Sequence, residues 1–153
     1  MQLVTEILQS YADRGIFRGF SAGPVRNGKA TYKLVWFRNR EYEITADTRK
    51  GVIRCPVVLP QVPPEIYAKL KLFIQSRHTE EVQTHRRIDP AKARANCAIR
   101  AGNVSVTVTV TDDDYEYATR RFVNLLHEIF LVFLQEHFDY QVAAYDLDPD
   151  NPL

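Results

Sequence analysis

One short stretch of the sequence has the glycine and lysine spacing of a phosphate-binding loop. In GPVRNGKA, Gly23, Gly28 and Lys29 match the P-loop pattern, and Ala30 stands where Ser or Thr would hold a magnesium ion. A P-loop follows a strand and opens a helix, so that backbone N–H groups face the phosphates. This stretch instead runs into ATYKLVWF, whose side chains alternate as in a strand. We therefore interpret it as an Asn-Gly turn at the entrance to a strand and predict no nucleotide site there.

The four histidines do not have the spacing of a metal site. His127 and His137 are ten residues apart on one expected helix, which places them about 15 Å apart along its axis. His78 and His85 lie in a polar connection. The sequence also lacks GxSxG, a dinucleotide-type glycine cluster and a locally supported Cys–His pair. We predict no catalytic residue, no metal site and no cofactor, and hence a protein that is not an enzyme.

The feature with the most functional weight is a basic polar connection, SRHTEEVQTHRRIDPAKARAN, at residues 76–96. Its cations are candidates for binding a partner: Arg77, Arg86, Arg87, Lys92 and Arg94. Three acidic residues interrupt them, and no aromatic residues interleave to stack bases. A solvated loop, or a loop that docks on an acidic partner, is therefore favoured, and a nucleic-acid-binding surface over residues 77–100 is the alternative.

Charge is unevenly distributed along the chain, although the net charge is only +1. Residues 69–100 contain eight Lys and Arg against three Asp and Glu, a net +5, and residues 101–153 contain two against ten, a net −8. Such asymmetry marks either a surface for nucleic acid or an acidic partner, or two regions that attract each other within one fold or between subunits. We favour the attraction, because no block has five consecutive like charges.

Apolar periodicity predicts an α+β framework for these residues. The expected helices cover 3–11, 63–74 and 115–140, and the expected strands cover 30–37, 42–46, 52–59, 97–100 and 103–111. The order is α-β-β-β-α-β-β-α, an antiparallel sheet with helices, and Phe17 and Phe20 are expected to pack against its core. Pro56 has no N–H to donate, so the third strand is predicted to be an edge or to be cut short there.

Two apolar features suggest surfaces for a partner. Trp36 and Phe37 are expected on opposite faces of the first strand, and both are candidate partner-binding residues. The segment Ile129–Leu134 is apolar all round the last helix, so that either both its faces are buried in the monomer or one face meets another chain. Together these features predict a homodimer.

Length and composition are typical of a single globular domain. We expect one domain over residues 1–145 and an acidic flexible tail over 146–153. The longest apolar run is six residues, too short to span a bilayer, and the N-terminus does not resemble a signal peptide. Cys55 and Cys97 have neither metal-type nor redox-type spacing, which is typical of a reducing compartment. We predict a cytoplasmic protein without membrane contact.

The order of elements over essentially the whole chain resembles that of the class I type III secretion chaperones and the related YbjN-like bacterial proteins. The resemblance implies a small cytoplasmic homodimer that binds extended segments of other proteins, without catalysis. The sequence pI of about 7.8 departs from the acidic character of secretion chaperones. The leading hypothesis is therefore a chaperone- or adaptor-like protein- or peptide-binding module.

Overall fold

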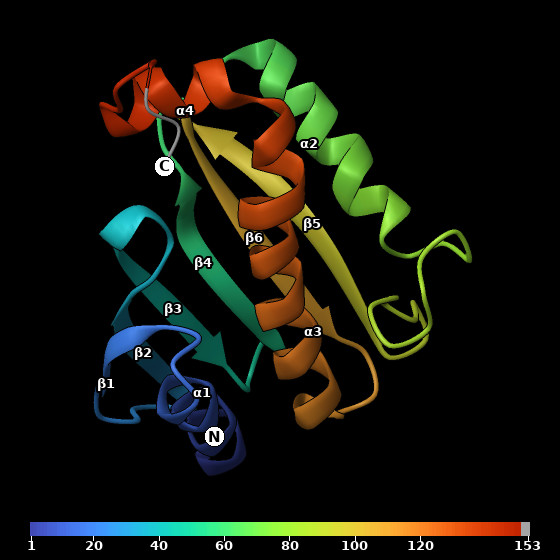
Figure 1. Cartoon of the computed structure of the whole chain (residues 1–153). Coiled ribbons are helices and arrows are strands. Elements are labelled where there is room, and N and C mark those ends of the chain that lie inside the picture. Colours follow the sequence, from blue (N-terminus) through green and yellow to red (C-terminus); the bar gives the residue numbers. More distant parts are fainter. Residues whose placement is uncertain (151–153) are drawn as a thin grey trace.

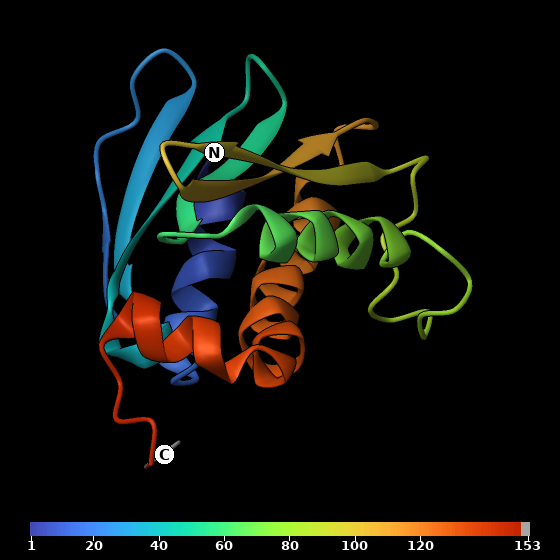
Figure 2. The ribbon, with the colours of Figure 1, turned by 90° about the horizontal axis from the view of Figure 1, so that it is seen from above.

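The computed structural model describes residues 1–150, which form an open antiparallel sheet with helices on one of its faces (Figures 1 and 2). The strands are β1 (Arg18–Ala22), β2 (Lys29–Val35), β3 (Glu41–Asp47), β4 (Val52–Leu59), β5 (Ala93–Arg100) and β6 (Asn103–Val110). The main helices are α1 (Gln2–Asp13), α2 (Pro64–Ser76), α3 (Tyr115–Glu128) and α4 (Phe138–Tyr145). The spatial order of the strands is β1-β2-β3-β4-β6-β5. The predicted α+β class and antiparallel sheet are confirmed, with six strands in place of five.

β1 is the strand that the sequence analysis missed. Its side chains do not alternate between buried and exposed, and only Phe20 is even half-buried. Its ladder with β2 is irregular between Arg18 and Ser21, where Gly19 has a φ of 62°. A short, bulged edge strand of this kind carries no apolar period that could be detected. The packing of Phe17 and Phe20 against the core is confirmed.

The GPVRNGKA stretch is a turn, as predicted. Asn27 and Gly28 both have positive φ, at 54° and 75°, and Arg26 and Lys29 exchange two backbone hydrogen bonds of 2.9 Å across them. This is the two-residue turn that Asn-Gly favours between antiparallel strands. The chain enters β2 directly and opens no helix, so the turn offers no helix N-terminus to a phosphate.

The helices pack on one face of the sheet, and this face holds the core. Alternate residues of the strands point into it and are buried, among them Tyr32, Leu34, Ile44, Ile53 and Val106. α3 contacts β4 and β6, α1 contacts β1 and α3, and α2 contacts β5. The other face carries no helix (Figure 2).

Pro56 lies inside the sheet, so the prediction that its strand forms an edge is wrong. β4 pairs with β3 on one side and β6 on the other, but the β3 ladder covers only three residue pairs and ends at Thr45↔Arg54. The ladder with β6 becomes irregular between Cys55 and Leu59. Because proline cannot donate a main-chain hydrogen bond, it fits only where pairing is interrupted. β3 and β4 consequently diverge beyond this point (Figure 1).

The predicted helix over 115–140 is broken into several pieces. α3 ends at Glu128, a π-helical turn covers Ile129–Phe133, a 3-10 turn covers Leu134–Glu136, and α4 follows. The π turn buries Phe130 but leaves the adjacent Leu131 and Val132 about half exposed, at 49% and 48%. The apolar segment is thus mostly satisfied within the monomer. The homodimer stays a prediction.

The turn that separates buried Phe130 from exposed Leu131 makes the two positions a matched pair. The Phe130 ring stacks on Phe37 at 4.7 Å between centroids and meets Trp36 edge-on at 5.3 Å. We expect Phe130→Ala to lower the free energy of unfolding by about 3–5 kcal/mol, because it removes a packed aromatic side chain. Leu131→Ala should change it by no more than about 0.5 kcal/mol. Urea denaturation measures both, and similar losses would contradict the π-turn geometry.

Candidate functional site

The uncovered face of the sheet is hollowed where β3 and β4 part. One hollow of about 450 Å³ lies between the two strands and is lined by Lys33, Glu41, Tyr42, Glu43, Pro56 and Val57. A second, of about 530 Å³, continues across β4 toward β6 and β5, and shares Pro56 and Val57 with the first. We call the two hollows together the sheet groove. Val57 stands between them and is 43% exposed, which is unusual for an aliphatic residue in an interior strand.

The two halves of the sheet groove differ in charge. Glu41 and Glu43 line the first half beside Lys33, and Arg54 and Arg100 line the second. Main-chain groups are also free for pairing there, because the β3–β4 ladder stops at Thr45 and leaves the stretch from 41 to 44 without a partner in β4. Unpaired main-chain groups of this kind are otherwise found at the edge of a sheet.

Both outer edges of the sheet are better protected than this opening. On β5, the Tyr67 hydroxyl donates to the Cys97 carbonyl at 3.4 Å, and His78 Nε2 accepts the Ala95 N–H at 2.9 Å. α2 and the residues after it thereby occupy main-chain groups of that edge. On the opposite side of the sheet, β1 is short and bulged. Both devices discourage strand addition at an edge.

A cluster of buried tyrosines lies on the core side of the sheet, behind the sheet groove. Tyr42 alternates with the groove residues Glu41 and Glu43, and its hydroxyl donates to the Phe37 carbonyl at 3.4 Å. Tyr140 donates to the Pro60 carbonyl at 2.5 Å. The Tyr145 hydroxyl is buried and has no hydrogen-bond partner among the described residues. Burial raises the pKa of Tyr145 to about 12 and raises the pKa of Tyr42 and Tyr140 as well.

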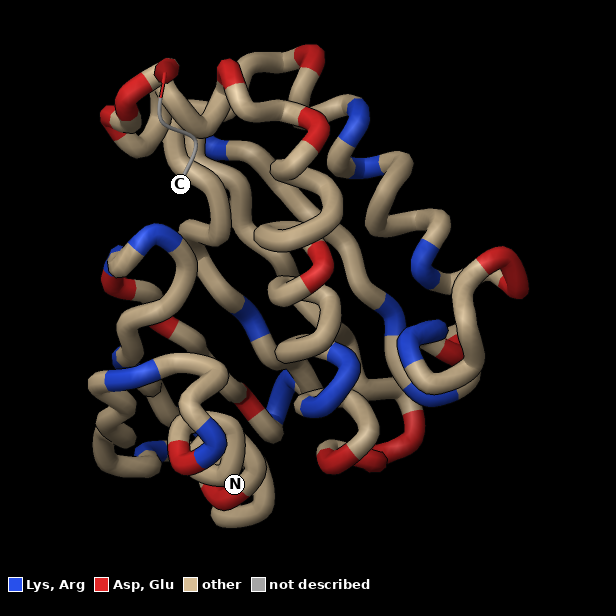
Figure 3. Tube along the Cα trace, viewed as in Figure 1, with Lys and Arg blue, Asp and Glu red and all other residues tan. Residues whose placement is uncertain are grey.

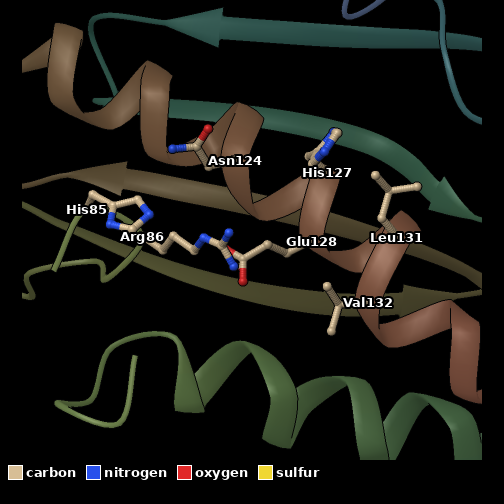
Figure 4. A pocket seen from close by; sticks show the side chains of 7 residues that line it. All are labelled: His85, Arg86, Asn124, His127, Glu128, Leu131 and Val132. Carbon is tan, nitrogen blue, oxygen red and sulfur yellow. The ribbon is translucent and has the colours of Figure 1, made fainter. Parts of the chain in front are cut away.

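A separate hollow of about 430 Å³ lies on the helix side of the molecule, and we call it the helix-side hollow (Figure 4). Asn124, His127 and Glu128 come from α3, Leu131 and Val132 from the π turn, and His85 and Arg86 from the connection. Polar donors therefore share this hollow with exposed aliphatic side chains.

Three of the five predicted cations, Arg77, Arg87 and Lys92, form contacts within the chain. Arg77 forms an ion pair of 2.7 Å with the buried Glu128 and lies over the Phe73 ring. Lys92 pairs with Asp114 at 3.0 Å and with Asp112 at 3.5 Å. The predicted attraction between the basic connection and the acidic C-terminal part of the chain thus occurs within the fold, although Lys, Arg, Asp and Glu also occur at many other points along the chain trace (Figure 3).

Arg87 and its neighbours also anchor the connection. Arg87 donates to the Val82 carbonyl, and its own carbonyl accepts hydrogen bonds from the Tyr117 hydroxyl and from Arg121 Nε. Ile88 is buried and donates its backbone N–H to the Arg77 carbonyl. The long connection is thus held to α3 by main-chain contacts at several points.

Arg86 and Arg94 are exposed, but the structure does not bring them together. Arg86 lines the helix-side hollow. Arg94 alternates along β5 with the buried Ala93 and Ala95, so it points to the uncovered face. The nucleic-acid alternative stays a prediction. Its phosphate contacts would depend on Arg94 and Arg100 on the uncovered face and on Arg86 on the helix side.

Trp36 and Phe37 lie beyond the end of β2 and not on its two faces, which corrects the sequence interpretation. Trp36 immediately follows the strand, and Phe37 begins a 3-10 turn, Phe37–Asn39. Both rings are half-buried against Phe130. Their place explains why a two-residue period was extended too far: the side chains are apolar, but the backbone turns at Trp36.

The expected tail begins where α4 ends. Asp146 has a φ of 53° and closes the helix, and Leu147 packs against the core. Residues 151–153 of the predicted tail lie outside the described residues. Within residues 1–150, no three His, Cys, Asp or Glu side chains gather as metal ligands, and none of the helices has the length and apolar character needed to cross a bilayer.

Comparison of the chain with protein-family models, curated proteins and solved structures gives no match.

The Arg77–Glu128 pair allows a test of the connection's anchoring. Arg77→Met leaves a buried carboxylate without its cation, and we expect a loss of about 3 kcal/mol in the free energy of unfolding. Adding Glu128→Leu should restore most of it, since the uncompensated charge is then removed. Arg86→Met serves as the exposed control and should be neutral. Urea denaturation of the four proteins decides this, and a double variant no more stable than Arg77→Met would contradict the expectation.

The unpartnered Tyr145 hydroxyl gives two predictions, one at neutral pH and one at alkaline pH. At pH 7, Tyr145→Phe should leave stability unchanged or raise it by about 1 kcal/mol, whereas Tyr140→Phe, which deprives the Pro60 carbonyl of its donor, should lower it by a similar amount. Tyr145 in the unfolded chain loses its proton near pH 10, while the folded state holds it to about 12. Its stabilising contribution is thus complete below pH 10 and is lost as pH rises through 12. Between pH 8 and pH 11, the urea midpoint should fall less for Tyr145→Phe than for the unaltered protein.

Proposed function

We propose that this chain is a non-enzymatic protein-binding module that holds an extended segment of another protein in the sheet groove. The observation that carries the proposal is the short β3–β4 ladder, three residue pairs between strands of seven and eight residues. An added strand finds the main-chain groups of β3 residues 41–44 that point away from β2 and have no partner in β4, and side-chain hollows on both sides of Val57. Main-chain pairing provides affinity and the hollows provide selectivity.

The chemistry of the groove favours binding over catalysis. The nearest thiol, Cys55, is buried, and burial raises its pKa to about 12, so that the nucleophilic thiolate is disfavoured. Glu41 and Glu43 lie on the same face of β3, where they suit recognition of a cationic side chain. This agrees with the chaperone- or adaptor-like role that the resemblance implies, and the chaperone-like fold is part of the proposal.

Peptides selected from a random phage-displayed library on the immobilised protein provide the probe. When a selected peptide is added to ¹⁵N-labelled protein, we expect the largest amide shift changes at residues 41–44 and around Val57. Methylation of alternate peptide nitrogens should weaken binding, because it removes N–H groups that pair with β3. Methylation of the intervening nitrogens should have little effect. Equal sensitivity at all positions, or shift changes confined to the helices, would refute main-chain pairing in the groove.

A matched pair of variants tests the same proposal through side chains. Val57→Asn places an amide between the two hollows, and we expect about tenfold weaker binding of the selected peptide, a loss of about 1.4 kcal/mol. Leu72→Asn changes a residue that is 66% exposed on α2, and it should bind like the unaltered protein. Equal affinities of the two variants would contradict the proposed site.

A further inference from the structure

We infer that the helix-side hollow is a second binding site, which takes an acidic peptide segment with an aliphatic residue beside its carboxylate. It lies on the opposite side of the sheet from the groove and does not depend on the proposed function. The hollow is formed by one stripe of α3 and the connection that approaches it (Figure 4). Asn124, His127 and Leu131 follow one another at helical spacing along this stripe.

The electrostatics of the hollow favour a carboxylate. Glu128 is the acidic residue that lines it, and its charge is already compensated by Arg77 at 2.7 Å. Arg86 extends into the same hollow from the connection, and the structure gives it no ion pair within residues 1–150. Arg86 thus provides a cation for an incoming carboxylate. The side chain of Asn124 and the imidazoles of His85 and His127 add hydrogen-bond donors.

The aliphatic half of the ligand follows from the π turn. Leu131 and Val132 are adjacent in the chain, and both remain about half exposed while their neighbours Phe130 and Phe133 are buried. They line the hollow together with Arg86, so that one ligand can meet both the cation and the apolar surface. Covering the exposed part of these two side chains releases water from apolar surface and favours an aliphatic partner.

Nucleic acid fits this hollow less well. No aromatic side chain lines it to stack a base, and the two exposed aliphatic residues would remain in contact with water beside a phosphate backbone. A single cation also gives few phosphate contacts. An acidic protein segment contacts both the cation and the aliphatic side chains of the hollow, and it is therefore the ligand that fits best.

Fluorescence anisotropy with short synthetic peptides tests the inference. The probe is a labelled peptide of alternating Asp and Leu, compared with one in which Lys replaces Asp and one in which Ser replaces Leu. We expect the Asp-Leu peptide to bind at least about tenfold tighter than either comparison peptide. Arg86→Glu should weaken this binding by about tenfold or more and reduce its salt dependence. The double variant Leu131→Ser, Val132→Ser should weaken it without changing the salt dependence.

Two variants on the other face separate the possible outcomes. Arg94→Glu makes the same charge change on the uncovered face and should leave binding intact, so equal losses with Arg86→Glu and Arg94→Glu would overturn the site as a mere effect of net charge. Val57→Asn should also leave binding of the Asp-Leu peptide intact. A loss of binding in this variant would place the peptide in the sheet groove, which would refute the second site but not the proposed function. Tighter binding of a single-stranded oligonucleotide, abolished by Arg86→Glu, would assign the hollow to nucleic acid instead. Unchanged melting temperatures establish that each variant is folded.

Discussion

The rest of the structure depends on the interruption of main-chain pairing at Pro56. A proline in an interior strand removes one donor from the ladder, and here the ladder to β3 ends two residues before it while the ladder to β6 becomes irregular around it. β3 and β4 therefore separate toward one end of the sheet (Figure 1). On the uncovered face this separation becomes the sheet groove. On the core face it leaves a space that other elements must fill.

Aromatic and polar contacts fill that space. Phe130 packs against Phe37 and Tyr42, and Arg38 donates to Gln141 at 2.7 Å, while Gln141 donates to the Leu134 carbonyl at the same distance. Gln141 is buried, and its hydrogen bonds join the turn after β2, the 3-10 turn Leu134–Glu136 and α4 into one unit. The π turn belongs to this closure, because it directs Phe130 into the core. Leu131 and Val132 are exposed as a consequence, and they form the apolar half of the helix-side hollow.

Two cations of the basic connection form ion pairs with the acidic C-terminal part of the chain inside the fold. Arg77 and Lys92 pair with acidic residues of the C-terminal region, and Asp114 also accepts the Tyr117 N–H at the start of α3. That hydrogen bond and Lys92 hold the pKa of Asp114 below its ordinary value. Arg77, Arg87 and Lys92 thus hold the connection in place. The exposed Arg86 and Arg94 lie on opposite sides of the sheet and do not form one continuous basic patch.

The sequence by itself determined the elements whose side chains repeat with a clear period: α1, α2, the valine face of β6 and the Asn-Gly turn before β2. It also indicated that pairing would be disturbed at Pro56, since a missing N–H is a property of one residue. It could not show that β4 is interior, because strand order depends on contacts between residues far apart in the chain. For the same reason, the sequence identified the cations of the connection but not which of them ion pairs would occupy. The bulged β1 and the break after Glu128 carry no periodic signal, and only tertiary packing decided them. The sheet groove and the helix-side hollow both arise where packing overrides the local pattern, the first at the divergence of two strands and the second at a π turn.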